Sequence, residues 1–282
     1  MNQIKETVMK VVFLFCACVC VLCVLLICLF LFANGIPAIA EIGPMKFLLG
    51  TVWKPGQGLY GIAPMILGSL YVTAGAMIIG VSLGVLTAVY MAKFGTKKIN
   101  QLLRPAVSLM AGIPSIIYGF FGLVVLVPLM RNLFGGGKSI LTASILLGIM
   151  ILPTIISISE SAIKAVPGTY YEGALALGAS HERSVFFVVL PAAKSGIMAA
   201  VVLGMGRAVG ETMAVIMVAG NQAILPESVT DGVRTMTANI VLEMGYAADL
   251  HRGALIATGV VLFVFILLIN LFLSLMKRRQ GA

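Results

Sequence analysis

Residues 169–221 read TYYEGALALGASHERSVFFVVLPAAKSGIMAAVVLGMGRAVGETMAVIMVAGN. The first half of this stretch is polar enough to lie outside a membrane, although apolar segments flank it on both sides. The second half has the composition of an apolar helix that carries Arg207 and Glu211 near its middle. We interpret the polar half as a docking element for a partner protein and the apolar half as part of a substrate path.

The overall composition is that of a protein embedded in a lipid bilayer. The 282 residues are 60% apolar and only 10% charged, with a mean hydropathy of +1.11. Soluble domains average about 45–50% apolar and about 25% charged residues. Long uninterrupted apolar runs favour helices, which satisfy their backbone groups internally, so we predict an all-α integral membrane protein. The net charge of +9 is scattered over loops, which argues against nucleic acid binding.

The apolar runs predict six membrane-spanning helices, because a bilayer core requires roughly 20 apolar residues per helix. The predicted spans cover about 11–33, 64–92, 105–130, 139–159, 195–219 and 254–276. The segments between them are expected to be loops, of which the longer ones cover 34–63, 93–104, 160–193 and 221–252. The domains predicted from this pattern are an N-terminal anchor with an external loop (1–60), a transmembrane domain with a polar loop at 164–191 (61–276), and a basic tail (277–282).

Local patterns refine the first three spans. Residues 38–40 resemble a signal-peptidase site, but the apolar run before them exceeds the 7–15 residues of a signal sequence, so an uncleaved anchor is preferred. Gly80 and Gly84 in the second span permit close helix packing. Pro114 in the third span removes a backbone donor and predicts a kink.

The first predicted span and the loop after it contain cysteine and aromatic residues whose roles can be inferred from their positions. Five cysteines lie between positions 16 and 28 in one apolar run, which favours simple packing over a disulfide or a metal site. Trp53 and Tyr60 lie in the predicted loop 34–63 and are expected to anchor it at the membrane interface.

The distribution of basic residues predicts the orientation. Six spans place both termini on one side of the membrane. Twelve Lys and Arg residues belong to that side: Lys5, Lys10, Lys93, Lys97, Lys98, Arg104, Lys164, Arg183, Lys194, Lys277, Arg278 and Arg279. The other side has six: Lys46, Lys54, Arg131, Lys138, Arg234 and Arg252. Basic residues are more frequent in cytoplasmic loops, so both termini and the loop 160–193 are predicted to be cytoplasmic.

The polar loop has the pattern of two short helices separated by a glycine. Thr169 and Glu172 fit a capping box, Gly178 suits the end of the first helix, and Ser180 can cap a second helix that ends before Pro191. Such a pair forms a compact projection outside the membrane. An amphipathic connector that lies on the lipid headgroups would have the same pattern.

The loop resembles that of the importer-type ABC permeases, in which the pattern E-A-A-x3-G-x9-I-x-L-P docks into an ATP-binding subunit. Matching residues stand at Glu172, Gly173, Ala174, Gly178, Val188, Leu190 and Pro191. The sequence departs from the pattern at Gly173, where the family has alanine, and at Val188, where it has isoleucine. Both changes are mild.

The residue sequences of two apolar stretches indicate which group of permeases the chain resembles. Residues 206–221 and 111–123 are similar to the phosphate-specific permeases, and GETMAV resembles the PstC-type more than the PstA-type subunit. The resemblance implies a type I ABC importer permease fold and one half of a heterodimer with a PstA-type sister in a bacterial or archaeal cytoplasmic membrane. It also implies two ATP-binding subunits, an extracytoplasmic phosphate-binding protein and transport by alternating access.

Arg207 is the basic residue that belongs to no loop. It stands four residues before Glu211, so the two can pair on one helix face. A charge in this position is costly unless it faces a cavity or a partner, so Arg207 is predicted to meet a phosphate oxyanion. A structural salt bridge between subunits is the alternative. Ser115 and Tyr118 are weaker candidates for the path, because such hydroxyls often bond to their own backbone.

The remaining features are interpreted as ordinary structure. Gly206 and Gly210 predict a helix contact with the sister subunit or the third span. The sequence GGGKS at 135–139 lacks the first glycine and the preceding strand of a phosphate-binding loop, so it is interpreted as a turn. The acidic residues of the loop 221–252 are interpreted as solvated. No enzyme activity, cofactor or metal site is predicted.

Two other functions fit the same sequence. One is a permease for another oxyanion, such as sulfate, molybdate or phosphonate. The other is a secondary transporter that needs no ATPase, although no internal repeat of the kind common in that class is apparent.

Overall fold

The computed structural model describes the backbone of residues 2–279 and the side chains of residues 5–271. The described chain is almost entirely helical. Its first helices are α1 (Asn2–Ile42), α2 (Pro44–Leu49), α3 (Ala63–Val89), α4 (Lys97–Gly112), α5 (Ser115–Phe121), α6 (Val127–Phe134) and α7 (Ile140–Lys164). They are followed by α8 (Gly168–Ala176), α9 (His181–Ser184), α10 (Leu190–Ala192), α11 (Lys194–Gly210), α12 (Met213–Val218), α13 (Met236–Glu243) and α14 (Asp249–Arg279).

Shorter elements complete the fold. Three π-helical segments cover Tyr90–Phe94, Gly122–Leu126 and Val185–Val189. The two strands β1 (Trp53–Lys54) and β2 (Leu59–Tyr60) form an antiparallel hairpin around a 3-10 turn at Pro55–Gln57. In this register Trp53 lies opposite Tyr60.

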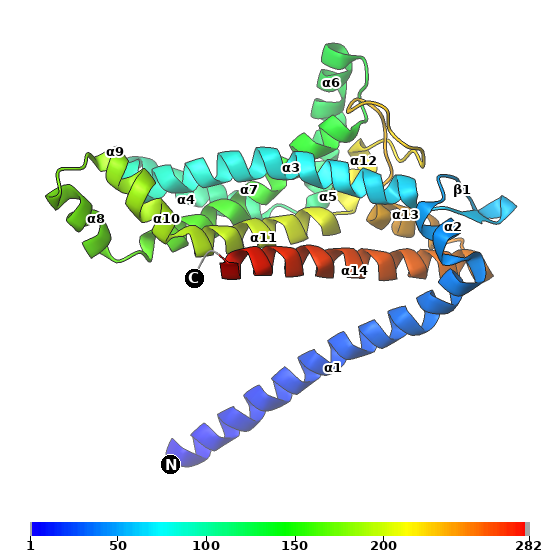
Figure 1. The fold of residues 1–282 in the computed structure, drawn as a ribbon, viewed down its shortest axis with the longest axis horizontal. Coiled ribbons are helices and arrows are strands. Elements are labelled where there is room, and N and C mark those ends of the chain that lie inside the picture. The colour runs from blue at the N-terminus through cyan, green and yellow to red at the C-terminus, as the bar shows by residue number, and fades with distance from the viewer. Residues whose placement is uncertain (1, 280–282) are drawn as a thin grey trace.

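Helices α3, α7 and α11 lie side by side and form the centre of the bundle (Figure 1). Their close approach depends on glycines. A Cβ on Gly80 would lie 2.6 Å from Ile151 of α7, and one on Gly84 would lie 2.7 Å from Ile155. Gly204 of α11 meets Ile155 from the other side. The packing role predicted for Gly80 and Gly84 is therefore confirmed.

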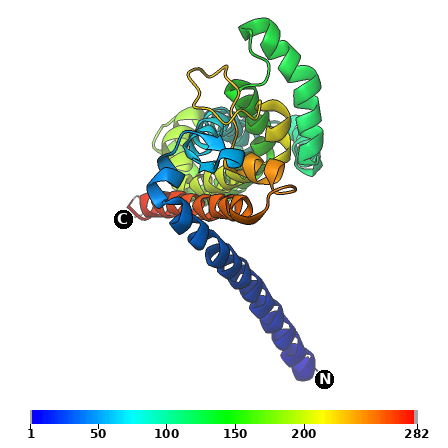
Figure 2. The ribbon, with the colours of Figure 1, turned by 90° about the vertical axis from the view of Figure 1, so that its right-hand side faces the viewer.

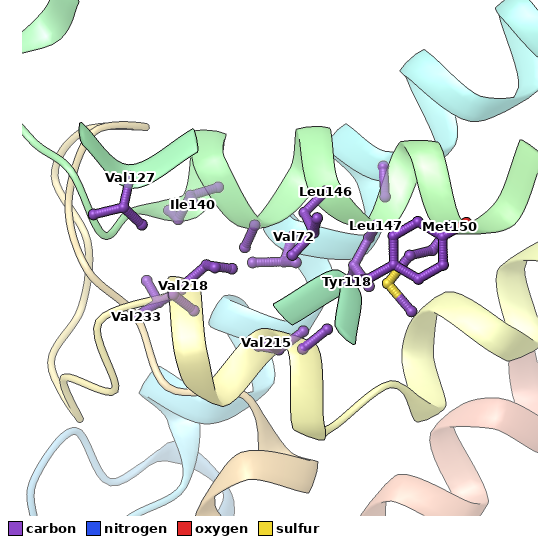
Figure 3. Close-up of a cluster of buried hydrophobic side chains, with 14 residues drawn as sticks. Val72, Tyr118, Val127, Ile140, Leu146, Leu147, Met150, Val215, Val218 and Val233 are labelled. Carbon is purple, nitrogen blue, oxygen red and sulfur yellow. The ribbon is translucent and has the colours of Figure 1, made fainter. Parts of the chain in front are cut away.

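The largest buried cluster lies where α5 and α12 meet this bundle (Figure 3). Val72 comes from α3, Leu146 and Met150 come from α7, and Val215 and Val218 come from α12. These side chains are almost completely shielded within the chain, so the short helix α12 is fixed by apolar packing despite its length.

Five helices are long and apolar enough to cross a membrane, or six if a bent pair is counted as one span. The five are Lys5–Ile42, Ala63–Phe94, Ser115–Phe134, Ile140–Lys164 and Asp249–Leu271. The bent pair consists of His181–Ala192 and Lys194–Gly210, with an angle of 67° between its parts. The predicted spans at 64–92, 139–159 and 254–276 each lie within or close to one of these helices.

The third predicted span is wrong in its first half. Residues 97–112 form the amphipathic helix α4 rather than the end of a basic loop and the start of a span. Thr96 caps this helix by accepting a hydrogen bond from Ile99 N. Pro114 does not kink the chain but ends the helix, because the residue before a proline is pushed out of the helical region, and Ile113 is extended. The span itself starts at Ser115.

The predicted loop 34–63 is partly helical. α1 continues through Pro37 to Ile42, and the hairpin then packs against α13 and α14. Trp53 and Tyr60 are buried in this cluster, so their prediction as interface anchors is wrong. The segment 221–252 is likewise not one polar loop, since it contains α13 and the start of α14.

Glu243 is the centre of a buried ionic cluster at this end of the molecule. Its carboxylate accepts hydrogen bonds from Trp53 Nε1 (2.9 Å), His251 Nε2 (2.9 Å) and Arg234 Nη1 (2.6 Å). The interpretation of Glu243 as a solvated loop charge is therefore wrong. Arg234 also donates to Asn239 Oδ1 and to the carbonyl of Asn221. The cluster joins the hairpin to α13 and α14.

The two ends of the bundle are built from different elements. The start of α1, the end of α14 and the helices α8 and α9 lie at one end, while β1, α2 and α13 lie at the other (Figure 1). This arrangement agrees with the sorting of the basic residues into two groups, and the assignment of the first end to the cytoplasm stays a prediction. Viewed along the bundle, α1 and α6 extend away from it in different directions (Figure 2).

Candidate functional site

Arg207 lies in the last turn of α11, facing α7. It is half-buried, and its Nη1 donates to Thr154 Oγ1 over 3.4 Å, a long hydrogen bond. Thr154 follows Pro153 within α7. Tyr118 of α5 lies in the same buried cluster as Met150 of α7, one turn before Thr154 (Figure 3). Side chains of α5, α7 and α11 therefore lie in this region of the bundle.

The predicted pairing of Arg207 with Glu211 is wrong. α11 ends at Gly210, and Glu211 is extended, with φ −70° and ψ 129°, so the two side chains do not share a helix face. The Glu211 carboxylate instead accepts hydrogen bonds from Thr212 N and Ala214 N, both at 3.1 Å. It caps the first turn of α12. Among the residues with described side chains, Arg207 forms no ion pair.

The break at Glu211 also means that the predicted span 195–219 is two helices. Its freed backbone groups find partners nearby, because the carbonyl of Glu211 accepts from Thr237 Oγ1 over 3.2 Å and that of Gly210 accepts from Thr212 Oγ1 over 3.2 Å. Interrupted helices of this kind are tolerated in membranes only where the backbone is satisfied by protein or lines a cavity.

The two hydroxyl candidates differ. The Tyr118 hydroxyl is buried and donates to the carbonyl of Met110 over 2.9 Å, so it connects the last turn of α4 to α5 across the break at Pro114. Ser115 begins α5 and is half-buried, and its hydroxyl makes no hydrogen bond within the described chain. Tyr118, but not Ser115, belongs to the buried cluster that includes Met150 of α7, one turn before Thr154.

Thr154 was missed by the sequence interpretation. A signal was present, since a hydroxyl side chain directly follows a proline inside an apolar span. Proline frees a carbonyl of the preceding turn, which makes such positions local polar sites within a membrane helix.

Gly206 and Gly210 face open space. A Cβ on either glycine would meet nothing within 4 Å, so they make no close contact with the third span. Their predicted contact with a sister subunit is untouched by this result and stays a prediction. Leu203 of α11 and Met213 of α12 are also exposed.

The docking element projects from the end of the bundle as the helices α8 to α10 (Figure 1). Gly178 separates α8 from α9 with a φ of +82°, and Ser180 caps α9 by accepting from Arg183 N, as predicted. The capping box is wrong, since α8 begins at Gly168 after Pro167, without a side-chain cap. The second helix also does not end before Pro191, because proline is tolerated in the first turn of α10.

The pattern residues of this element are distributed between its surface and its base. Glu172, Gly173 and Gly178 are exposed, Ala174 is buried, and Leu190 packs partly against the buried base with Pro191 exposed beside it. Two apolar side chains of the same element also point outwards, since Leu177 is 91% exposed and Phe187 is 75% exposed. They line a hollow of about 410 Å³ together with Tyr170, Ala174, Arg183 and Val188. An exposed apolar surface of this kind is typical of a protein interface.

Comparison with known proteins gives a consistent result. Residues 80–281 match the family described as binding-protein-dependent transport system inner membrane component. The chain is 38% identical to "Probable ABC transporter permease protein YqgH" of Bacillus subtilis (strain 168), over 98% of this chain and 93% of that protein. It is 35% identical to "Phosphate transport system permease protein PstC" of Mesorhizobium japonicum, over 89% of this chain and 84% of that protein.

Solved structures of transporters share the fold. A chain from the structure "Inward facing conformations of the MetNI methionine ABC transporter" superimposes with a TM-score of 0.63 at 21% identity, over 81% of this chain and 99% of that one. A chain of an amino acid ABC transporter gives a TM-score of 0.56 at 22% identity, over 77% of this chain and 93% of that one. At this level of identity the likeness concerns the fold alone.

Proposed function

This chain belongs to the family of binding-protein-dependent transport system inner membrane components, and from that premise we propose that it forms half of the path of an ATP-driven importer of inorganic phosphate. It is a membrane-embedded permease subunit with the fold of type I ABC importers, and not an enzyme. Such a subunit works with an ATPase and a substrate-binding protein. The proposal adds a PstA-type sister subunit, a location in the cytoplasmic membrane, and termini on the cytoplasmic side.

The observation that supports an oxyanion as the substrate is how few hydrogen-bond partners the Arg207 guanidinium has within the described chain. Its guanidinium has five N–H donors, and within the described chain these make one long hydrogen bond, to Thr154, and no ion pair. A charged side chain near the centre of a membrane costs about 2.5–3.5 kcal/mol even on a lenient scale. A phosphate oxyanion can accept two parallel hydrogen bonds from a guanidinium, which offsets this cost whenever substrate is present.

The connections of the docking element suggest how ATP hydrolysis moves the path. α7 leads directly into α8, and α10 leads directly into α11, which carries Arg207. A displacement of α8–α10 by the ATPase therefore tilts α11, which carries Arg207, and α7, which contacts its guanidinium through Thr154. We propose that this tilt alternates access to Arg207 between the two sides, while all bond breaking takes place in the ATPase.

Uptake of labelled phosphate tests the proposal. Cells that lack their own phosphate importer should regain ATP-dependent uptake when they receive this chain with its sister subunit, ATPase and binding protein. Excess unlabelled phosphate should compete, while sulfate, molybdate and phosphonate should not. Competition by one of those anions instead would identify a different oxyanion permease. Uptake that survives ATP depletion while ion gradients persist would identify a secondary transporter.

Gly178→Val should separate docking from membrane insertion. At a φ of +82° a residue with a Cβ is strained by about 1–2 kcal/mol, and no atom lies within 4 Å of the added carbon, so the strain is in the backbone alone. We expect a subunit that inserts normally but loses most of its bound ATPase during purification in detergent.

Gly173→Ala is the matched control for this variant. Gly173 lies inside α8 with the same open space around it, and alanine is the better helix former. This variant should retain the ATPase fully. Retention by Gly178→Val at the level of Gly173→Ala would show that the turn does not position the docking element.

A further inference from the structure

The base of the docking element contacts the end of α3, a helix to which it is not joined in sequence. His181, at the start of α9, packs edge-on against Phe94 with ring centroids 4.7 Å apart. Its Nδ1 shares a hydrogen bond of 2.7 Å with the Tyr171 hydroxyl of α8. Phe94 also contacts Phe186, and Lys93 Nζ lies 5.4 Å from the centre of the Tyr171 ring. We call the residues Phe94, Tyr171, His181 and Phe186 the clasp.

Two π-helical segments meet at the clasp. Tyr90–Phe94 ends α3, and Val185–Val189 continues α9, and both belong to one buried apolar cluster. π-helical turns are rare, and they occur frequently at functional sites. Both sides of this contact therefore have a backbone that departs from the regular helix.

The π-helical end of α3 is in turn fixed to α4. Asn100 Nδ2 donates to the carbonyls of Met91 (2.9 Å) and Gly95 (3.3 Å), which the irregular turn leaves free. Arg104, one turn further along α4, donates to the buried carboxylate of Glu160 in α7 over 2.9 Å. The first half of α4 is thus tied by hydrogen bonds to the end of α3, which carries Phe94, and to α7.

The other end of α4 reaches the candidate substrate path. Met110 lies in its last turn, and its carbonyl accepts the hydrogen bond from Tyr118. Tyr118 packs in one buried cluster with Met150, one turn before Thr154, the hydrogen-bond partner of Arg207. The 16 residues of α4 cover roughly 24 Å at 1.5 Å per residue. α4, with Pro105 inside it, therefore runs from the end of α3 beside the docking element towards the part of the bundle that holds Arg207.

We propose that His181 is a positioning residue, which clasps the docking element to the end of α3 and so makes α4 move with it. α4 would then transmit the displacement to Tyr118 and Arg207, in parallel with α7 and α11. The proposal rests on the proposed function, because it assigns a second mechanical route to the same transport cycle. The rival is that α7 and α11 alone transmit the movement and that the clasp only fills space.

The first test measures phosphate import per ATP hydrolysed in the reconstituted complex. His181→Leu and Phe94→Leu remove the ring contacts, and Asn100→Ala removes the link to α4. Each should retain the ATPase and still hydrolyse ATP, while phosphate imported per ATP falls about tenfold. Tyr171→Phe loses only the hydrogen bond and should show a smaller fall. The double variant Phe94→Leu/Asn100→Ala should import as much phosphate per ATP as either single variant, because both substitutions interrupt the same mechanical route.

A ratio that stays at the wild-type value in all four variants would overturn the proposal. So would a parallel loss of uptake and ATP hydrolysis, since that is the result of general damage to the fold. Exposed Lys97→Gln, at the start of α4 and outside the clasp, is the control and should leave the ratio unchanged.

The second test does not depend on the substrate. Spin labels at Thr169 in α8 and Lys98 in α4, both exposed, report the distance between docking element and α4, after replacement of the native cysteines. This distance should stay constant between the nucleotide-free and the vanadate-trapped complex, and it should change in Phe94→Leu. A change of distance in the wild type would overturn the proposal. If the wild type imported no phosphate, the proposed function would fail, and the distances would still decide the role of the clasp.

Discussion

Phosphate uptake by the Arg207→Gln variant should fall about 10- to 100-fold while the complex still assembles. A hydrogen bond to a charged group contributes about 1.5–3 kcal/mol, and neutral glutamine cannot present the bidentate fork of the guanidinium. Assembly should persist, because within the described part of the chain Arg207 forms no ion pair, so its removal leaves no buried carboxylate without a partner. The measurement is initial uptake of labelled phosphate, normalised to purified complex.

Three further variants make this result specific. Arg131→Gln removes one exposed positive charge from α6 and should leave uptake unchanged, which controls for net charge. Arg207→Lys keeps the charge but not the fork, and should be impaired by a smaller factor. Thr154→Val removes the hydrogen-bond acceptor but leaves the guanidinium, so it should reduce uptake only a few-fold. Uptake near the wild-type rate in Arg207→Gln would exclude the substrate contact.

Glu243→Ala should be the most destabilising single change at the end of the bundle that holds the β hairpin and α13. It removes the acceptor of Trp53, His251 and Arg234 at once, and it leaves the Arg234 guanidinium, whose side chain is only 18% exposed, without its counter-charge. Removing one partner of a buried ion pair typically costs about 3–5 kcal/mol. The midpoint of thermal unfolding of the purified complex, followed by tryptophan fluorescence, should fall by roughly 10 °C. Trp53, the single tryptophan of the sequence, lies in the cluster itself.

The comparison with a surface carboxylate isolates the effect of burial. Glu227 is exposed, and Glu227→Ala should change the midpoint by no more than about 2 °C. The double variant Arg234→Gln/Glu243→Gln leaves neither charge unpaired, so it should be more stable than the sum of its two single variants implies. Strict additivity would mean that the ion pair does not hold the cluster together.

Hydropathy was sufficient to predict the helices that are long and apolar on all sides. α3, α7 and α14 lie where the apolar runs lie, and Gly80 and Gly84 were correctly predicted as contact points. The αL position of Gly178 was also predictable, because a glycine between two short helical patterns is typical of a left-handed residue that ends the first helix. These features depend on local composition.

The errors concern features that depend on distant parts of the chain. The end of α11 at Gly210 is fixed by the Glu211 carboxylate turning to cap α12, and by Thr237 from another helix. Helical periodicity alone predicts that Arg207 and Glu211 face each other, and only the three-dimensional break shows otherwise. α4 was missed because its mean composition is polar, although one face of it packs on α7.

The burial of Trp53 and Glu243 was not predicted for the same reason. The hydrogen bond between them joins residues 190 positions apart in the sequence. An aromatic residue in a Gly- and Pro-rich segment and an acidic residue in a polar one are each more often exposed. No local signal identifies the pair. The role of Arg207 in the substrate path stays a prediction, while its hydrogen bond to Thr154 and the turn of Glu211 towards α12 were not predicted.

The pairing of α1 with α14 has a consequence for biosynthesis. α1 packs chiefly against α14, where its Gly35 meets Ala257 and Val260 and its Ala38 meets Gly253. At about 5–20 residues per second, the ribosome needs roughly 10–40 s to proceed from the end of α1 to the start of α14. Throughout that time the nascent anchor must remain in the bilayer without its chief intramolecular partner. Its mean hydropathy of 3.4 over an 18-residue window allows it to do so. A chain whose synthesis stops before α14 leaves this face of α1 without its partner helix.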